Sequence, residues 1–310
     1  MIKVEGLSKY YGDSRAIENI SFDIKHGEIV GLLGLNGAGK STILKILGCY
    51  LAPSRGSASI GGFSVSTEAQ NVRELIGFLP DTSPLYDEMT ARAYLNFVAR
   101  LKGVESRHVK DAVDEALEKT NLTNVQDAHL GTLSHGFRQR VGIAQALVHK
   151  PKVLILDEPI NGLDPIQIVE MRDLIKSLKG DHTVILSSHI LSEITKTCDR
   201  ILIIDSGELK AQGTELSIEG KIKHNVRVEL QVKGSSESIV SKLRAIPGVV
   251  ACEQKESVED AMRFVCEAED DLRGAMAKAV VNSGADLVGL SKLDDGLESL
   301  FMKLVKNSKN

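Results

Sequence analysis

The chain has 310 residues, of which 42% are hydrophobic and 26% are charged. This balance is typical of globular proteins, and the length allows one large domain or one medium and one small domain. The formal net charge of −4 argues against a dedicated nucleic-acid binder, which would neutralise phosphates with clustered Lys and Arg, so we expect no nucleic-acid partner. No apolar run approaches the about 18–20 residues that cross a bilayer.

The four cysteines are scattered along the chain, at Cys49, Cys198, Cys252 and Cys266. They form no C-x-x-C pair and have no His at metal spacing, which predicts neither a zinc site nor a disulfide framework. We therefore expect four reduced cysteines in a cytosolic protein. Met1–Val4 leads directly into a strand-like alternation, without the basic and then apolar region of a secretory signal. If this protein serves a membrane, we expect it to do so through a partner.

The first half of the chain passes from strands to helices. Short strands with intervening turns are predicted over residues 2–7, 16–24 and 28–33, before a glycine-rich loop and a helix over 41–49. Apolar residues at helical spacing predict helices over 91–101, 109–118 and 137–149. Strands over 153–156, 183–187 and 201–204 then alternate with helices over 165–178 and 191–197. This alternation predicts a parallel sheet covered on both faces.

Composition changes near residues 214–224, which we interpret as a linker between a first domain, 1–213, and a second domain, 225–310. The second domain has the order β-α-β-β-α-β, which predicts a ferredoxin-like fold. Its expected strands are 226–232, 249–254, 262–266 and 286–290, and its expected helices are 236–245 and 270–282, with a last helix over 296–305.

A phosphate-binding loop is predicted between the strand that ends at Leu33 and the helix that follows. Residues Gly34–Ser41 fit G-x-x-x-x-G-K-[ST]. Glycines let backbone N–H groups approach phosphate oxygens, and the helix start adds its positive end. Lys40 would then contact the β- and γ-phosphates, and the Ser41 hydroxyl would ligate Mg²⁺. A glycine-rich turn opening an ordinary helix is the alternative. The expected ATP-binding residues here are Gly34, Asn36, Gly37, Ala38, Gly39, Lys40, Ser41 and Thr42.

An apolar strand, Val153–Leu156, ends in Asp157 and Glu158. Ligands of parallel sheets bind beyond the carboxyl ends of the strands, where these two acids fall. Side chains alternate along a strand, so adjacent acids cannot both point the same way. We assign Asp157 to the Mg²⁺ ion and Glu158 to the attacking water as general base. The alternative is a solvated strand end.

Further motifs follow in a characteristic order: the phosphate loop, Leu133–Arg140 with the sequence Leu-Ser-His-Gly-Phe-Arg-Gln-Arg, Leu154–Pro159, Leu163-Asp164-Pro165 and His189. In this order the chain resembles ABC ATPases over about residues 2–213, and it looks closest to the ATPase subunits of ABC-2-type export systems, including the gliding-motility-like group. The resemblance implies an α/β P-loop NTPase with antiparallel β and helical subdomains. A small C-terminal α+β ferredoxin-like domain follows, implied to be regulatory or partner-binding.

In such proteins the Leu-Ser-x-Gly stretch completes the ATP site of the opposite subunit. The resemblance gives this role to Ser134 and Gly136. It suits the physics, because Ser134 would cap a helix whose free N–H groups can bind a phosphate. A plain helix cap is the alternative. The chain departs from the common Leu-Ser-Gly-Gly-Gln at His135, which replaces the first Gly, and at Phe137, which replaces Gln.

The resemblance assigns four other positions. His189 matches the switch histidine that contacts the γ-phosphate, and Asp164 the residue at the dimer seam. Tyr11 matches the aromatic that stacks on adenine, with Tyr10 as its rival. Asp81 stands where many members have Gln, and its carboxylate remains an oxygen ligand for Mg²⁺. By analogy, the segment after it, residues 85–101, would face a membrane partner.

The resemblance thus implies an ATPase with ATP and Mg²⁺ as cofactors. It would dimerise, as a homodimer or with a related subunit, and drive integral membrane permease subunits, in export rather than import. Its expected location is cytoplasmic, on the inner face of the cell membrane through those permeases. One rival is a soluble ABC ATPase acting on ribosomes or DNA, against which the single ATPase domain and the lack of coiled-coil heptads argue. Another is a non-hydrolysing regulatory module, against which Glu158 and His189 argue.

Overall fold

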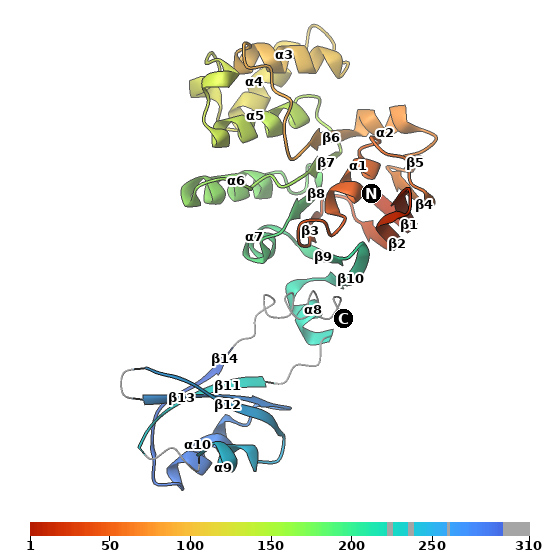
Figure 1. The fold of residues 1–310 in the computed structure, drawn as a ribbon. Coiled ribbons are helices and arrows are strands. Elements are labelled where there is room, and N and C mark those ends of the chain that lie inside the picture. Colours follow the sequence, from red (N-terminus) through yellow and green to blue (C-terminus); the bar gives the residue numbers. More distant parts are fainter. Residues whose placement is uncertain (222–225, 235–238, 259–260, 294–310) are drawn as a thin grey trace. The chain divides into compact units, whose positions relative to one another are not determined.

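The computed structural model describes residues 1–221, 226–234, 239–258 and 261–293 (Figure 1). Residues 1–216 form one compact unit, and the described residues from 217 onward form a second. Among the helices of these residues, none combines the length and the apolar character that crossing a membrane would require.

A six-stranded sheet organises the first unit, with the order β10-β9-β3-β8-β7-β6. All neighbours pair in parallel except the edge strand β10, which runs antiparallel to β9. Every residue of β3, β7 and β8 is buried, as expected for strands covered on both faces. The strands are β3 (Ile29–Leu33), β6 (Ile76–Leu79), β7 (Val153–Leu156), β8 (Thr183–Ser188), β9 (Arg200–Asp205) and β10 (Glu208–Gly213).

A smaller antiparallel sheet, with the order β2-β1-β4-β5, shares one hydrophobic core with helix α1 (Lys40–Leu47) and the main sheet. Leu44 of α1 is fully buried in this core. The part of the first unit that contains the two sheets also includes helices α2 (Ala69–Leu75), α6 (Pro165–Ser177) and α7 (Leu191–Thr197). The strands of the smaller sheet are β1 (Ile2–Tyr11), β2 (Ser14–Ile24), β4 (Arg55–Ile60) and β5 (Phe63–Ser64).

Three helices form a separate layer with its own apolar core (Figure 1). Leu95, Val113 and Val141 are fully buried there, one from each helix. The helices are α3 (Ala91–Leu101), α4 (Val109–Lys119) and α5 (His135–Leu147), with short 3-10 turns at Thr123–Val125 and Leu130–Thr132. Sequence analysis missed α2, β5, β6 and β10, which are short or lie at sheet edges.

The second unit is a four-stranded antiparallel sheet with the order β12-β13-β11-β14 and two helices. Phe264 of the sheet and Met276 and Val280 of α10 are buried together in its core. This topology confirms the predicted ferredoxin-like fold. Its elements are β11 (Val226–Lys233), α9 (Ile239–Arg244), β12 (Val249–Val258), β13 (Ala261–Ala268), α10 (Arg273–Val281) and β14 (Asp286–Leu293). Helix α8 (Glu215–Lys221) occupies part of the predicted linker, and the helix expected over 296–305 lies outside the described residues.

One expectation about the cysteines is wrong. Cys252 of β12 lies opposite Cys266 of β13, and a disulfide joins them. Cys49 and Cys198 are free thiols. The pairing follows from the register of the two strands, which spacing along the sequence does not reveal, because 14 residues separate the two cysteines.

We expect Gly77→Ala to destabilise the first unit. Gly77 lies in β6, where an added Cβ would collide with the backbone carbonyl of Ala146 in α5. Such overpacking costs about 1–3 kcal/mol, so the midpoint of thermal unfolding should fall by several degrees. Calorimetry on the purified chain measures this change. Gly274→Ala in α10 is the matched control, because its Cβ would meet open space. Equal midpoints for the wild type and the Gly77 variant would contradict the prediction.

Candidate functional site

The loop between β3 and α1 is held in a shape that requires glycine. Gly39, the N-cap of α1, has a φ of 105°, and a Cβ there would lie 2.6 Å from Cγ2 of Ile17. A Cβ on Gly34 would collide with the carbonyl oxygen of Ile204 in β9. The loop therefore packs tightly against β2 and β9. Because α1 begins at Lys40, its free N–H groups lie at the end of this loop.

The loop opens onto a cavity of about 450 Å³, a size within the usual range for small-molecule sites. Segments far apart in the sequence contribute to its wall, and most of the side chains are polar. It brings together nine of the residues predicted to bind ATP, bind Mg²⁺ or act in catalysis. The lining residues are Ala16, Leu35, Asn36, Gly37, Gly39, Lys40, Ser41, Thr42, Asp81, Glu158, Asn161 and His189.

The ammonium group of Lys40 is buried, with only 6% of the residue exposed. Nζ donates to the carbonyl oxygens of Gly34 at 2.7 Å and Leu35 at 3.3 Å. It also lies 3.2 Å from Oε1 of Glu158. A buried cation needs such partners, because an unpaired charge away from water is very costly. The phosphate loop and the strand-end acid are thus in direct contact.

Glu158 holds an unusual backbone conformation for a residue with a side chain. Its φ is 50°, in the left-handed region, where strain costs of order 1–3 kcal/mol and clusters at functional sites. Its N–H donates to Oγ of Ser187 at 2.8 Å. Its Oε2 lies 3.0 Å from Nδ1 of His189. The strained backbone therefore places one carboxylate between Lys40 and His189.

Asp157 points elsewhere, as the alternation along a strand predicts. It is 2% exposed, and its Oδ1 accepts a hydrogen bond of 2.6 Å from Oγ of Ser187. Ser187 therefore links both acids, accepting from one and donating to the other. Sequence analysis missed this role. The role depends on the parallel register of β7 and β8, which pairs Leu156 with Leu186. This register sets Ser187 beside Asp157, and the sequence alone does not reveal it.

The predicted Mg²⁺ ligands fit that ion chemically. Ser41 and Asp81 line the cavity, and Asp157 is buried beside Glu158. Hydroxyl and carboxylate oxygens are the ligands that Mg²⁺ prefers. Within the described parts of the chain, no group of three or more His, Cys, Asp and Glu residues could hold a metal by itself. A magnesium ion here would complete its shell with phosphate oxygens and water, as is usual for nucleotide sites.

Some predicted residues lie outside the cavity lining. Ser134 caps α5, its Oγ accepting from the N–H of Phe137 at 3.5 Å, and Gly136 packs against Gln167 of α6. Tyr11 is 50% exposed, with Nζ of Lys9 5.4 Å from its ring centre. Its rival Tyr10 is less exposed, and its hydroxyl donates to Glu18. Gly34 and Ala38 are buried or shielded within the loop, whose carbonyl groups accept hydrogen bonds from Lys40 and Gly207.

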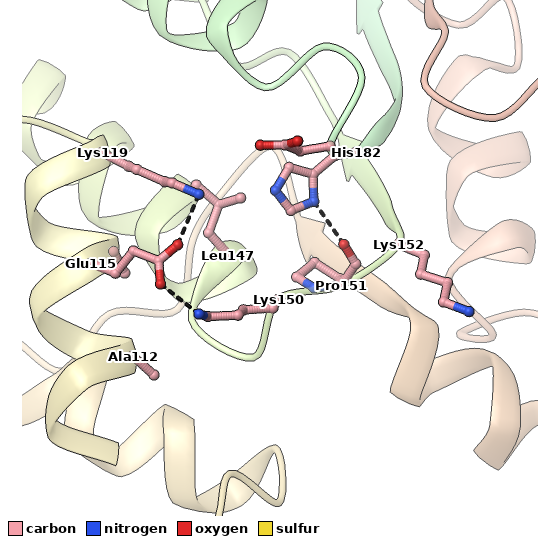
Figure 2. Close-up of a pocket in the computed structure, with 10 residues that line it drawn as sticks. Ala112, Glu115, Lys119, Leu147, Lys150, Pro151, Lys152 and His182 are labelled. Atoms are coloured by element: carbon pink, nitrogen blue, oxygen red, sulfur yellow. Dashed lines mark hydrogen bonds and ion pairs between the residues drawn. The ribbon is translucent and has the colours of Figure 1, made fainter. Parts of the chain in front are cut away.

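A second cavity, of about 280 Å³, lies at the opposite ends of β7 and β8 (Figure 2). Glu115 of α4 pairs there with Lys119 at 2.9 Å and with Lys150 at 2.6 Å. Hydrogen bonds from Lys150 and Lys119 hold the pKa of Glu115 below its usual value. Nδ1 of His182 lies 2.7 Å from the carbonyl oxygen of Pro151. None of the predicted site residues lines this cavity, so we place the chemistry in the larger one.

A phosphate loop after β3 and an acid pair after β7, at one edge of a parallel sheet, define a P-loop ATPase. Residues 17–161 match the family described as ABC transporter. The chain is 34% identical to the bacitracin transport ATP-binding protein BcrA of Bacillus licheniformis, covering 98% of this chain and 97% of that protein. It is 32% identical to the linearmycin resistance ATP-binding protein LnrL of Bacillus subtilis, covering 98% of each.

Solved structures agree with these relatives. One is an ATP-binding subunit of an ABC transporter, 31% identical with a TM-score of 0.65, covering 71% of this chain and 92% of that chain. Another is a dimeric ATP-binding cassette in a post-hydrolysis state bound to ADP and Pi, 27% identical with a TM-score of 0.63, covering 69% and 98%. The chain therefore belongs to the ATP-binding proteins of ABC transporters, and the expected family, fold and ATPase activity are confirmed.

We expect Ser187→Ala to reduce kcat with little change in ATP affinity. The change leaves the Glu158 N–H and the Asp157 carboxylate without their shared buried partner. Such a loss costs about 1–3 kcal/mol, which corresponds to about a fivefold to hundredfold lower kcat if it acts on catalytic geometry. Steady-state ATPase assays and nucleotide titrations measure both quantities.

Ser177→Ala is the matched control, because it removes a hydroxyl that donates to the carbonyl of Leu174 within α6. It should hydrolyse ATP at the wild-type rate. A Ser187 variant with unchanged kcat would show that the acids are positioned without this hydroxyl.

Proposed function

We propose that two copies of this chain, or one copy and a related subunit, close head to tail around two ATP molecules and drive separate membrane permeases. One observation carries the proposal. Most of the predicted ATP-binding residues line one cavity, whereas Ser134 and Gly136 begin α5 outside it. A second subunit would bring such a helix start against the same nucleotide, where its N–H groups would bind the γ-phosphate.

Within each site, Lys40 binds the β- and γ-phosphates, and the adenine stacks on Tyr11. Ser41, Asp81 and Asp157 would hold Mg²⁺, which would neutralise charge on the phosphate oxygens. The γ-phosphate competes with Glu158 for the Lys40 ammonium group, since both are anions within reach of the same Nζ. Binding of ATP thereby releases Glu158 to accept a proton from the attacking water, with His189 beside it at the γ-phosphate.

The same contacts explain how hydrolysis could reopen the pair. ATP bridges the phosphate loop of one subunit and the start of α5 of the other. Hydrolysis and loss of the γ-phosphate remove this bridge, so the closed state loses the interaction that favoured it. Alternation between closed and open pairs is the motion that the permeases would use.

The membrane partner is proposed to dock on the segment 85–101. Tyr86, Phe97 and Leu101 are exposed there, by 52%, 43% and 73%. The rings of Tyr86 and Phe97 lie 6.0 Å apart and form one aromatic surface. Aromatic residues are enriched at protein interfaces. Docking here would hold a cytoplasmic chain on the inner face of the membrane, and the two named relatives support an export role. The second unit is proposed to be regulatory or partner-binding.

We expect Glu158→Gln to form a stable dimer in ATP. The variant keeps the ATP contacts but lacks the carboxylate that we assign to hydrolysis, so the bridge should persist. Gel filtration with ATP should show a dimer, and without nucleotide a monomer. Adding Lys40→Ala should abolish ATP binding and with it the dimer. A Glu158 variant that stays monomeric in saturating ATP would refute the head-to-tail proposal.

We expect Phe97→Asp to weaken co-purification with an integral membrane protein. A charge in the exposed aromatic surface must be desolvated on docking, which opposes binding. Pull-downs from detergent-solubilised membranes, quantified by mass spectrometry, test this. Val169→Asp in α6 is the matched control, because Val169 is 44% exposed, close to the 43% of Phe97, and lies outside residues 85–101. Equal recovery of membrane partners by both variants would remove residues 85–101 as the docking surface.

A further inference from the structure

The start of α5 contacts the loop that follows Glu158 within the same subunit. Nε2 of His135 lies 3.0 Å from the carbonyl oxygen of Asn161. A carbonyl oxygen only accepts, so this ring nitrogen carries the proton and donates. The ring also packs on Gly162, where a Cβ would lie 3.2 Å from Nε2. Gly162 has a φ of 73°, which glycine adopts without strain.

The contacted loop leads directly into the ATP cavity. Asn161 lines that cavity together with Glu158, and its N–H donates to the Glu158 carbonyl at 3.2 Å. The loop ends at Asp164, whose carboxylate caps α6 by accepting from the N–H groups of Ile166 and Gln167. His135 is therefore attached to a short segment fixed at one end by the catalytic acid and at the other by a helix.

Two further contacts join α5 to α6, the helices on either side of the His135–Asn161 contact. A Cβ on Gly136 would lie 2.6 Å from the side chain of Gln167, so the two helices approach closely at this point. One turn further along, Arg140 pairs with Glu170 at 2.5 Å. These contacts join α5, which begins at His135, to α6, the helix that follows the loop containing Asn161.

We propose that His135 is a positioning residue that fixes the loop of residues 158–164 to the start of α5. The inference rests on the proposed function. Through this contact, the helix start that would engage the partner's ATP is tied to the subunit's own catalytic acid. Glycine, which occupies this position in the common Leu-Ser-Gly-Gly-Gln motif, has no side chain to make the contact. The link is thus an addition specific to the Leu-Ser-His-Gly variant found in this chain.

Three variants separate the hydrogen bond from simple ring packing. His135→Phe keeps a ring of similar size but has no donor. His135→Gln keeps an N–H donor at a similar distance from the backbone. His108→Phe is the matched control, because it makes the same exchange at the N-cap of α4, where the His side chain makes no capping hydrogen bond. Circular dichroism and the thermal midpoint verify that all three fold.

The first measurement is hydrogen exchange of the amides of residues 158–164 in the nucleotide-free chain. Loss of a hydrogen bond of ordinary net strength should speed local opening about fivefold in His135→Phe. His135→Gln and His108→Phe should exchange at wild-type rates. Equal exchange in His135→Phe and the wild type would overturn the inference. Equal acceleration in His135→Phe and His135→Gln would also overturn it, because the donor would then be irrelevant.

The second measurement separates ATP binding from turnover. In His135→Phe we expect kcat to fall about threefold to tenfold while the ATP dissociation constant, measured in the Glu158→Gln background, stays within twofold. Rescue of kcat by His135→Gln is the result that a merely structural role would not produce. Accelerated exchange with an unchanged kcat would overturn the positioning role. If exchange responds as predicted but Glu158→Gln never dimerises in ATP, the proposed pairing fails while the contact itself stands.

Discussion

The buried pair of Lys40 and Glu158 determines how the site is built. An ammonium group with 6% exposure cannot remain unpaired, and its partners are two carbonyl groups of its own loop and one carboxylate. The carboxylate comes from a residue more than a hundred positions further along the chain. The pair therefore requires that β3 and β7 end at the same edge of one sheet, which the parallel register through β8 ensures.

Sequence analysis located both partners of this pair for physical reasons. Continuous apolar strands indicate a sheet covered on both faces, and ligands of such sheets bind beyond the carboxyl ends of the strands. A glycine-rich loop after one such strand and two acids after another must then meet. In the structure, Lys40, Ser41 and Glu158 line one cavity, whereas Asp157 lies outside that lining. The ferredoxin-like order of the second unit could be predicted in the same way, from the alternation of short elements.

What the sequence could not supply are contacts set by register and by side-chain direction. Ser187 bonds both acids only because β8 is aligned with β7 in one particular register. The Cys252–Cys266 disulfide depends on the register of β12 and β13. His135 was recognised as a departure from the common motif, but its contact with Asn161 requires the approach of α5 to the loop. A one-residue slip of β8 against β7 would remove the Ser187 contacts, and a slip of β12 against β13 would separate the two cysteines, although the sequence would be unchanged.

The negative charges around the cavity affect the part that Asp81 can play in the site. Glu158, Asp157 and Asp81 bring three carboxylates close to the buried ammonium group of Lys40. The family resemblance implies an uncharged Gln at the position of Asp81 in many members. The triphosphate is itself strongly negative, and like charges at short range repel. An exposed loop carries Asp81, whereas Asp157 is fixed by Ser187. On the proposed assignment of Asp81 to Mg²⁺, the additional carboxylate would favour a nucleotide that arrives with its divalent cation, because ligation of that cation would offset the repulsion by Asp81.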